Sequence, residues 1–194
     1  MTQLLQKAID QRIVLNGNWS DFKQLQHLAE DSPGVRMAFY NGEIELFMPG
    51  LQHEAFSEII GYLVTTFLLS RGIVFVPSGS VTQEKEGRAS AQADKSYCFG
   101  SAKSIPDLSI EVIFTSGSPN KLARYQALGV PEVWFWEDGV LKLYHLRDRG
   151  YESIDRSELP GLDQLDIAQL QRCILIAQTD FAGAVQQFQQ VCNR

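Results

Sequence analysis

Two segments in the middle of the sequence, each led by an aspartate, carry side chains suited to holding a divalent cation. Asp94 opens the first segment, and Asp107 and Glu111 both lie in the second, Asp107-Leu108-Ser109-Ile110-Glu111. Both segments are rich in apolar and β-branched residues and are predicted to be strands. Because residues two apart on a strand share a face, Asp107, Ser109 and Glu111 are expected to point the same way.

The carboxylate of Glu111 would lie in the middle of a strand with apolar neighbours. A charge in that position is costly unless a cation or hydrogen-bond donors compensate it. A magnesium ion shared with Asp94 would do so, since Mg²⁺ is normally held by one or two carboxylates together with water and phosphate. Sites of this kind commonly hydrolyse phosphodiesters. The alternative is a buried ion pair with an arginine such as Arg124.

Further polar side chains can complete such a site. Lys121 lies in the first turn of the helix predicted after the second strand, where a lysine can orient a water and stabilise charge on phosphate; a solvated helix lysine is the alternative. His53 and Glu54 open the longest predicted helix, where the imidazole can donate a hydrogen bond, bind a metal or simply contact the helix start. Glu43 and Glu45 share one strand face and can line a cleft or face water.

Helices and strands alternate in the middle of the sequence, and strands follow one another towards its end, which predicts a mixed α/β sheet flanked by helices. Helices are expected at 4–13, at 20–28 with Ser20 as the cap, at 56–68 with a stop at Gly72, at 118–128 from Ser118-Pro119, and as two short helices from Asp166. Strands are expected at 36–40, 43–48, 73–77, 80–84, 94–99, 107–114, 133–136, 140–146 and 151–154. The polar segment 85–92 is expected to be an exposed, mobile connection.

Composition predicts one soluble globular domain. The chain of 194 residues is 44% hydrophobic and 21% charged, which suits a single core over 1–194. N-terminal helices are expected within 1–32, the core at 36–156 and C-terminal helices at 166–192. The three cysteines, without a CxxC spacing, predict reduced thiols in the cytoplasm. The longest apolar stretch, 59–69, is too short to cross a membrane, and the N-terminus lacks a secretory signal.

The sequence resembles the Uma-type restriction endonuclease family, within the PD-(D/E)XK nuclease superfamily, in three stretches: NGEIELFMPGLQHE, QADKSYCFG and PDLSIEVIFTSGSPNKLARYQALGVPEVWFWEDGVLKLYHL. The similarity covers about residues 19–165. It is most specific between 106 and 136, where a PDL-x-x-EV strand, a lysine-bearing helix and GVPE-x-W follow in family order. The resemblance implies a restriction-endonuclease-like α/β fold and hydrolysis of DNA phosphodiesters with Mg²⁺, or with Mn²⁺.

Carried over residue by residue, the resemblance implies that Asp94 and Glu111 bind the metal. The lysine that usually follows two residues after the second acid is absent, because that position is Ile113. Lys121 resembles the relocated lysine that this family carries on the next helix, where it would assist the attacking water. Ala93 stands where the superfamily has a proline, which changes the backbone preference but removes no ligand.

The resemblance also implies roles for residues outside the central motif. His53 and Glu43 match family positions that could complete the catalytic pocket, and Asp107 and Gln92 are additional candidates to line it. Two functions remain open: an active Mg²⁺-dependent DNA endonuclease, or a nuclease-fold DNA-binding or regulatory module without catalysis. The acidic residues and the lysine favour the first, whereas the net charge of −6 and the shortage of clustered Lys and Arg favour the second.

DNA is the expected partner, and a homodimer is expected because a duplex has two strands to cut. The aromatic segment 133–144 could face a second subunit, but plain core packing is favoured. The segment 85–91, with Lys85 and Arg88, could contact the nucleic-acid backbone or be an ordinary solvated loop.

Overall fold

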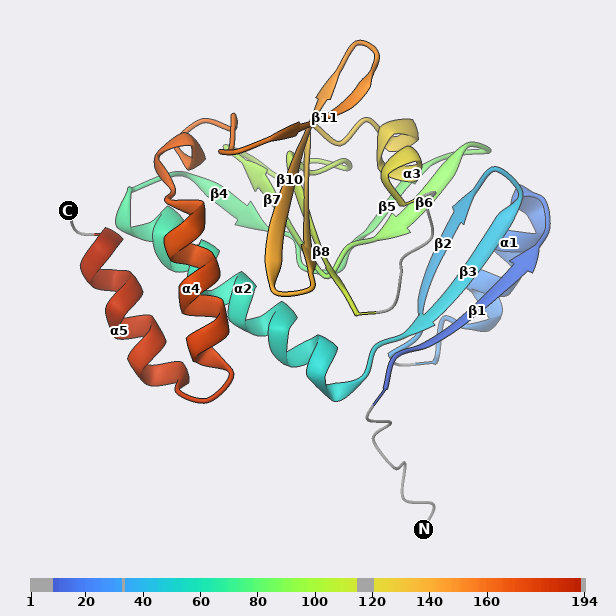
Figure 1. Ribbon diagram of the computed structural model, residues 1–194. Coiled ribbons are helices and arrows are strands. Elements are labelled where there is room, and N and C mark those ends of the chain that lie inside the picture. Colours follow the sequence, from blue (N-terminus) through green and yellow to red (C-terminus); the bar gives the residue numbers. More distant parts are fainter. Residues whose placement is uncertain (1–8, 33, 115–120, 193–194) are drawn as a thin grey trace.

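The computed structural model describes residues 9–32, 34–114 and 121–192, which form two β-sheets and the helices around them (Figure 1). The first sheet consists of β1 (Gln11–Asn16), β2 (Arg36–Tyr40), β3 (Glu43–Met48), β5 (Thr82–Lys85) and β6 (Ala89–Gln92). Its strand order is β1-β3-β2-β6-β5, and its neighbouring strands are antiparallel.

The second sheet is mixed. It consists of β4 (Phe75–Pro77), β7 (Lys95–Phe99), β8 (Leu108–Ile113), β9 (Glu132–Glu137), β10 (Val140–Arg147) and β11 (Gly150–Ile154), in the order β11-β10-β9-β8-β7-β4. The strands β8 and β9 run parallel, and the chain between them contains α3 (Lys121–Leu128). A parallel pair requires such a crossover connection, and here the crossover carries the predicted lysine.

Helices α2 (Leu51–Ser70) and α4 (Ile167–Ala177) cover one face of the second sheet, and α5 (Phe181–Cys192) packs against these two helices (Figure 1). The short 3₁₀ helix Leu162–Gln164 comes just before α4. Helix α1 (Trp19–Leu28) packs on β2 and β3 of the first sheet. On the opposite side of the second sheet, α3 packs against β6, β8 and β9. None of the helices in the described part of the chain has the length and apolar character needed to span a bilayer.

The strand β8 shows why the candidate acid is accessible from α3. Leu108, Ile110 and Val112 belong to the large core under α2, whereas Ile113 belongs to the separate apolar cluster under α3. Alternation along the strand therefore directs Glu111 towards α3. The aromatic segment that follows is core rather than interface, because Trp134, Phe135 and Trp136 are 0%, 8% and 1% exposed.

Much of the predicted element order is confirmed. The hairpin from 36 to 48 has the predicted bounds, and its turn residues Asn41 and Gly42 adopt φ values of 50° and 80°, the left-handed geometry that a two-residue turn requires. The long helix, the meander β9-β10-β11 and the two C-terminal helices are also present. The predicted helix start Ser118-Pro119 lies outside the described residues.

Two predictions about local structure near the N-terminus are wrong. Residues 11–16 form strand β1 rather than the end of a helix, because they pair along the whole of β3; residues 4–8 are not described. Asn18, not Ser20, caps α1, since its side chain accepts from the backbone N–H groups of Ser20 and Asp21. The predicted mixed sheet is the second sheet, and the antiparallel first sheet is an addition to it.

The segment 85–92 is not a mobile connection. Its second half is β6, in which Ala89, Ser90 and Ala91 are buried. Their small side chains allow α3 to pack closely on the strand, which a reading based on polarity alone would miss. Lys85 and Arg88 remain exposed at the hairpin between β5 and β6.

Candidate active site

The carboxyl group of Asp94 is buried at the point where the chain passes from β6 to β7. One oxygen, Oδ2, accepts a hydrogen bond of 2.6 Å from the backbone N–H of Val112. The other, Oδ1, lies 2.8 Å from Nε2 of His53 and accepts from Nη1 of Arg36. Burial alone would raise the pKa of Asp94, but the hydrogen bond and charge of His53, with the charges of Arg36 and Lys121, lower it. Asp94 is therefore held as a carboxylate.

Glu111 occupies the middle of β8 and is 5% exposed. Its Oε2 atom accepts from Nζ of Lys121 at 2.6 Å, and its Oε1 atom accepts from the hydroxyl of Tyr125. Both donors come from α3, so this one short helix closes over the carboxylate. The ion pair that was considered with Arg124 is instead made with Lys121, because Arg124 turns to Glu45.

The structure thus brings Asp94, Glu111 and Lys121 into one cluster. Val112, whose N–H is bound by Asp94, directly follows Glu111 on β8. Lys121 pairs with Glu111 and its charge also acts on Asp94. Residues separated by up to 27 positions in the sequence are joined by the pairing of β7 with β8 and by the crossover helix.

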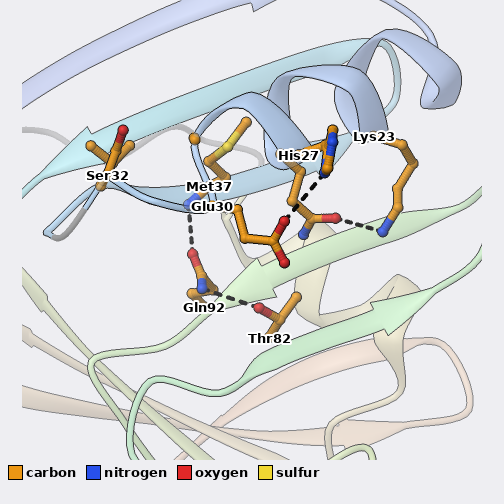
Figure 2. A pocket seen from close by; sticks show the side chains of 10 residues that line it. Lys23, His27, Glu30, Ser32, Met37, Thr82 and Gln92 are labelled. Atoms are coloured by element: carbon orange, nitrogen blue, oxygen red, sulfur yellow. Dashed lines mark hydrogen bonds and ion pairs between the residues drawn. The ribbon is translucent and has the colours of Figure 1, made fainter.

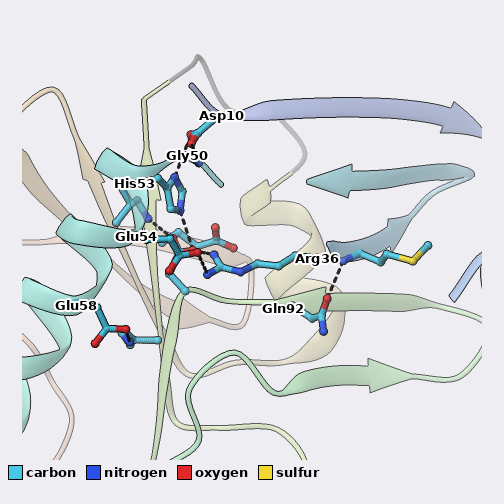
Figure 3. A network of polar contacts seen from close by, with 12 residues as sticks. Asp10, Arg36, Gly50, His53, Glu54, Glu58 and Gln92 are labelled. Atoms are coloured by element: carbon cyan, nitrogen blue, oxygen red, sulfur yellow. Dashed lines mark hydrogen bonds and ion pairs between the residues drawn. The ribbon is translucent and has the colours of Figure 1, made fainter. Parts of the chain in front are cut away.

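The imidazole of His53 links Asp94 to a second carboxylate, that of Asp10. Figure 3 shows His53 beside Asp10. Its Nδ1 atom is 3.0 Å from Oδ2 of Asp10, and the same aspartate accepts from the backbone N–H of Gly50 through Oδ1 at 2.8 Å. Although burial alone would lower the pKa of His53, Asp94 and Asp10 raise it. With both ring nitrogens facing carboxylates, the side chain is arranged as a hydrogen-bond bridge.

Arg36 extends this network to the surface. Its Nη2 atom donates to Glu54 at 2.7 Å, while Nη1 donates to Asp94. Figure 3 shows the guanidinium group reaching from β2 towards the start of α2. Glu54 is 41% exposed at its side chain, so this arm of the network ends in solvent.

A second ionic cluster surrounds Glu45 on β3. Its Oε2 atom accepts at 3.1 Å from Arg12 of β1 and at 3.1 Å from Arg124 of α3. Burial alone would raise the pKa of Glu45, but the charges of Arg124, Lys121 and Arg12 lower it. The family resemblance pointed to Glu43, which lies two residues earlier on the same strand, opposite Tyr40 of β2. The structure places Glu45 in the ionic cluster.

The two additional candidates lie in different places. Oε1 of Gln92 accepts from the backbone N–H of Met37 at 2.7 Å, and Gln92 lines the same small cavity as Glu111 and Lys121. Asp107 precedes β8 and accepts from the N–H of Phe99 at 2.7 Å and from Lys103. It therefore fixes the loop at the opposite end of β8 from Glu111.

Two small cavities open beside these clusters and share Glu45, Phe47 and Lys121 in their walls. Gln92 and Met37 also line a larger cavity of about 480 Å³ beneath α1, shown in Figure 2. Lys23 and His27 reach this cavity from α1. The candidate site therefore borders a polar hollow between α1 and the β5-β6 hairpin.

A divalent cation suits the chemistry of the carboxylate pair. Asp94 and Glu111 offer the oxygen ligands that Mg²⁺ prefers. Asp94 is paired with Arg36 and Glu111 with Lys121, and a metal ion could replace either cationic side chain. Within residues 9–32, 34–114 and 121–192 there is no group of three or more His, Cys, Asp or Glu residues arranged to hold a metal. The remaining coordination would have to come from water and phosphate.

Sequence reasoning missed Tyr125, Asp10 and Arg36. Tyr125 falls within the helix predicted at 118–128, and its ring is fully buried. A buried tyrosine normally finds a partner for its hydroxyl. That rule could have pointed to Glu111. Asp10 gave no comparable signal, because it lay in a segment predicted to be helical.

Comparison with known proteins identifies the family. The family model Uma2, described as "Putative restriction endonuclease", matches residues 19–174. The chain belongs to the Uma2 family. No sequence among curated proteins gives a significant match to this chain.

The fold is shared with a solved structure. The structure described as "a putative nuclease belonging to DUF820" from Anabaena variabilis aligns with a TM-score of 0.52 at 17% sequence identity. The alignment covers 71% of this chain and 90% of that one. The restriction-endonuclease-like α/β fold predicted for this Uma2 chain is confirmed.

Proposed function

We propose that this Uma2 protein is a Mg²⁺-dependent endonuclease that hydrolyses phosphodiester bonds in DNA. The observation that carries the proposal is the cluster of Asp94, Glu111 and Lys121. The buried carboxylate of Asp94, just before β7, binds the strand β8 that carries the buried Glu111, and Lys121 contacts Glu111. When bound there, Mg²⁺ would neutralise phosphate charge and lower the pKa of a water molecule.

The chain's own residues have distinct roles in this proposal. Asp94 and Glu111 would hold the cation. Lys121, released from Glu111 when the metal's charge replaces its own, would hydrogen-bond the attacking water and stabilise the charge that develops on the phosphate. His53 and Tyr125 would hold the two carboxylates in position by hydrogen bonds.

The alternative is a nuclease-fold module that binds DNA without cutting it. The closed state of Glu111 favours this reading, because Lys121 and Tyr125 occupy both of its oxygens. Opening the site requires Lys121 to leave an ion pair that is 11% exposed on the lysine side and 6% on the glutamate side. The two readings differ in whether a metal ion can displace the lysine.

The decisive experiment incubates the protein with supercoiled, linear and branched DNA over a range of Mg²⁺ and Mn²⁺ concentrations. Asp94→Asn and Glu111→Gln keep the side-chain shapes and remove the charges. Glu137→Gln is the control, since its carboxylate pairs with Lys142 in an exposed position near the turn between β9 and β10. We expect metal-dependent cleavage by the wild type and by the control, and a loss of about a hundredfold or more in the two site variants.

The opposite result would support the DNA-binding or regulatory module. Equal, metal-insensitive background from the wild type and both site variants, with all proteins folded by circular dichroism, would show that the cluster does not cut DNA. Binding of the same DNA would then be measured separately by fluorescence anisotropy.

We also propose that the enzyme acts in the cytoplasm as a homodimer, because two copies can address the two strands of a duplex. Light scattering of the purified protein, alone and with duplex DNA, tests this part. A monomer in both conditions would contradict it without affecting the proposed chemistry.

A further inference from the structure

Four cationic side chains converge beside the carboxylate pair. Arg12 and Lys121 line one small cavity, and Arg36, Lys121 and Arg124 line the one that adjoins it. They come from β1, β2 and α3, so residues far apart in the sequence supply positive charge to one place. Such convergence is what a protein needs to bind an anion.

The arginines around Glu45 are paired differently from the other two cationic side chains. Lys121 is paired with Glu111, and Arg36 with Asp94 and Glu54. Arg12 and Arg124, by contrast, share the single carboxylate of Glu45. At Glu45, two guanidinium groups therefore face one carboxylate.

The hydrogen-bonding capacity of these arginines is also incompletely used. The Nε atoms of Arg12 and Arg124 are buried and have no hydrogen-bond partner among the described residues. Arg124 as a whole is only 6% exposed. A buried N–H group without an acceptor is unfavourable, so a ligand that supplies the acceptor would be favoured.

We propose that Arg12 and Arg124 form a binding site for a phosphate group of the DNA backbone, with Glu45 as the internal counter-ion that the phosphate replaces. The inference rests on the proposed function and deepens it. The planar guanidinium group binds phosphate oxygens through two parallel hydrogen bonds. A phosphodiester carries one negative charge, the same as the Glu45 carboxylate that it would replace.

The position of Arg124 connects this site to the catalytic cluster. Arg124 lies on α3 between Lys121 and Tyr125, which both contact Glu111. Glu45, Glu111, Lys121 and Arg124 line one cavity. A phosphate held by Arg124 would therefore lie next to the proposed metal-binding carboxylates, and the same helix would position the DNA backbone and the lysine.

The test measures binding of a short fluorescent DNA duplex by anisotropy in EDTA, so that the metal plays no part. Arg124→Gln and Arg12→Gln should each weaken binding about tenfold and reduce the slope of log affinity against log salt by about 1. Glu45→Gln should instead tighten binding severalfold, because it removes the competing carboxylate. Arg147→Gln is the matched control, since Arg147 is paired with Glu158 and Glu152 on the exposed end of β10.

The arginine variants and Glu45→Gln should change DNA affinity in opposite directions, which distinguishes phosphate binding from a structural role. If the cluster only stabilises the fold, Arg124→Gln and Glu45→Gln should both lower the melting temperature and leave DNA affinity unchanged. That result would overturn the inference. If Arg124→Gln does not fold, the DNA affinities of Arg12→Gln and Glu45→Gln decide the question. The Arg12 side chain is 24% exposed, so its replacement should disturb the fold less.

The failure of this inference can be told apart from the failure of the proposed function. Wild-type protein that binds and cuts DNA, with unchanged affinity in the arginine variants, would remove the phosphate site and leave the endonuclease. Wild-type protein that neither binds nor cuts DNA would remove both.

Discussion

Asp94 accepts a hydrogen bond through Oδ2 from the backbone N–H of Val112 at a distance of 2.6 Å. The register of the two strands explains this contact. Lys95 of β7 pairs with Ile110 of β8, so the antiparallel register, continued by one residue, places Asp94 opposite Glu111. An aspartate at this position both binds the neighbouring strand and presents its second oxygen to His53 and Arg36. Its place is set by the sheet rather than by a flexible loop.

Replacing Lys121 with methionine should reduce DNA cleavage by about a hundredfold or more. The attacking water and the phosphate would lose the hydrogen bonds that the lysine would donate to them. Methionine keeps most of the aliphatic length, so α3 should remain packed. Initial rates of supercoiled DNA nicking at saturating Mg²⁺ measure the effect. Lys142→Met, at an exposed lysine paired with Glu137, should cleave like the wild type.

Removing the Lys121 charge should also change the carboxylate that it covers. Without Lys121, Glu111 keeps only the Tyr125 hydroxyl of its two described donors, so a cation should bind there more easily. Binding of Mn²⁺ followed by its electron paramagnetic resonance signal should be as tight as in the wild type or tighter. Weaker Mn²⁺ binding by Lys121→Met would contradict the proposal that lysine and metal compete for Glu111.

Tyr125→Phe should lower both stability and metal affinity. The substitution removes the hydroxyl that donates to Oε1 of Glu111 in a fully buried setting, which costs about 1–3 kcal/mol when an acceptor is left unsatisfied. Loss of a residue that orients a metal ligand typically weakens metal binding by about 10–100-fold. Urea denaturation and the Mg²⁺ concentration for half-maximal cleavage measure the two effects.

A matched control for Tyr125→Phe is Tyr97→Phe. The hydroxyl of Tyr97 donates to the carbonyl of Gly61 and lies near Thr65, in the core under α2. Its removal should lower stability without changing the Mg²⁺ requirement. If both variants shift the metal requirement equally, the Tyr125 hydroxyl has no special role at Glu111.

The acidic pair and its lysine could be predicted partly from a local pattern and partly from the family resemblance. Glu111 interrupts an apolar strand, and a charge in that setting predicts a partner. The lysine was found through the order of motifs on neighbouring elements, and it does contact Glu111. The alternation of β8 then gave the correct side of the sheet for this acid.

The rest of the site depends on contacts that no local pattern encodes. Arg12 and Glu45 meet only because β1 pairs with β3, and the helical prediction for 4–13 hid that pairing. Pairing with another strand overrode the weak amphipathic signal of the segment. The choice between Glu43 and Glu45 likewise required the positions of Arg12 and Arg124, which come from distant elements.

Asp10→Asn should reduce cleavage by loosening His53 while leaving DNA affinity unchanged. Asparagine can still accept from the N–H of Gly50, but the bond from His53 loses its charge. Hydrogen bonds to charged groups contribute about 1.5–3 kcal/mol, so a fall of this order in unfolding free energy is expected. Asp21→Asn, at an exposed helix start, controls for the loss of one carboxylate elsewhere.

The readout that separates positioning from mere stability is the metal requirement. If His53 positions Asp94, Asp10→Asn should need about tenfold more Mg²⁺ for half-maximal cleavage. An unchanged requirement, at a temperature where the variant is fully folded, would limit Asp10 to a structural role.

The stability that Glu45 contributes should disappear in acid. Its pKa is lowered from the ordinary value of 4.5 by Arg124, Lys121 and Arg12 against the effect of burial. A carboxylate with a lowered pKa in the folded state contributes its full stability above the ordinary pKa and loses it as the pH falls through the folded value. The unfolding free energies of wild type and Glu45→Gln, measured by urea denaturation, should therefore differ most near neutral pH. They should converge as the pH falls below about 4.5.

The exposed pair of Glu137 with Lys142 provides the comparison for this pH series. The unfolding free energy of Glu137→Gln should differ from that of the wild type by no more than about 1 kcal/mol, because an exposed ion pair contributes little to stability. A difference between wild type and Glu45→Gln that stays constant from neutral pH to well below 4.5 would show that the shape of Glu45, not its charge, stabilises the fold. The carboxylate could then not act as the counter-ion that a DNA phosphate replaces.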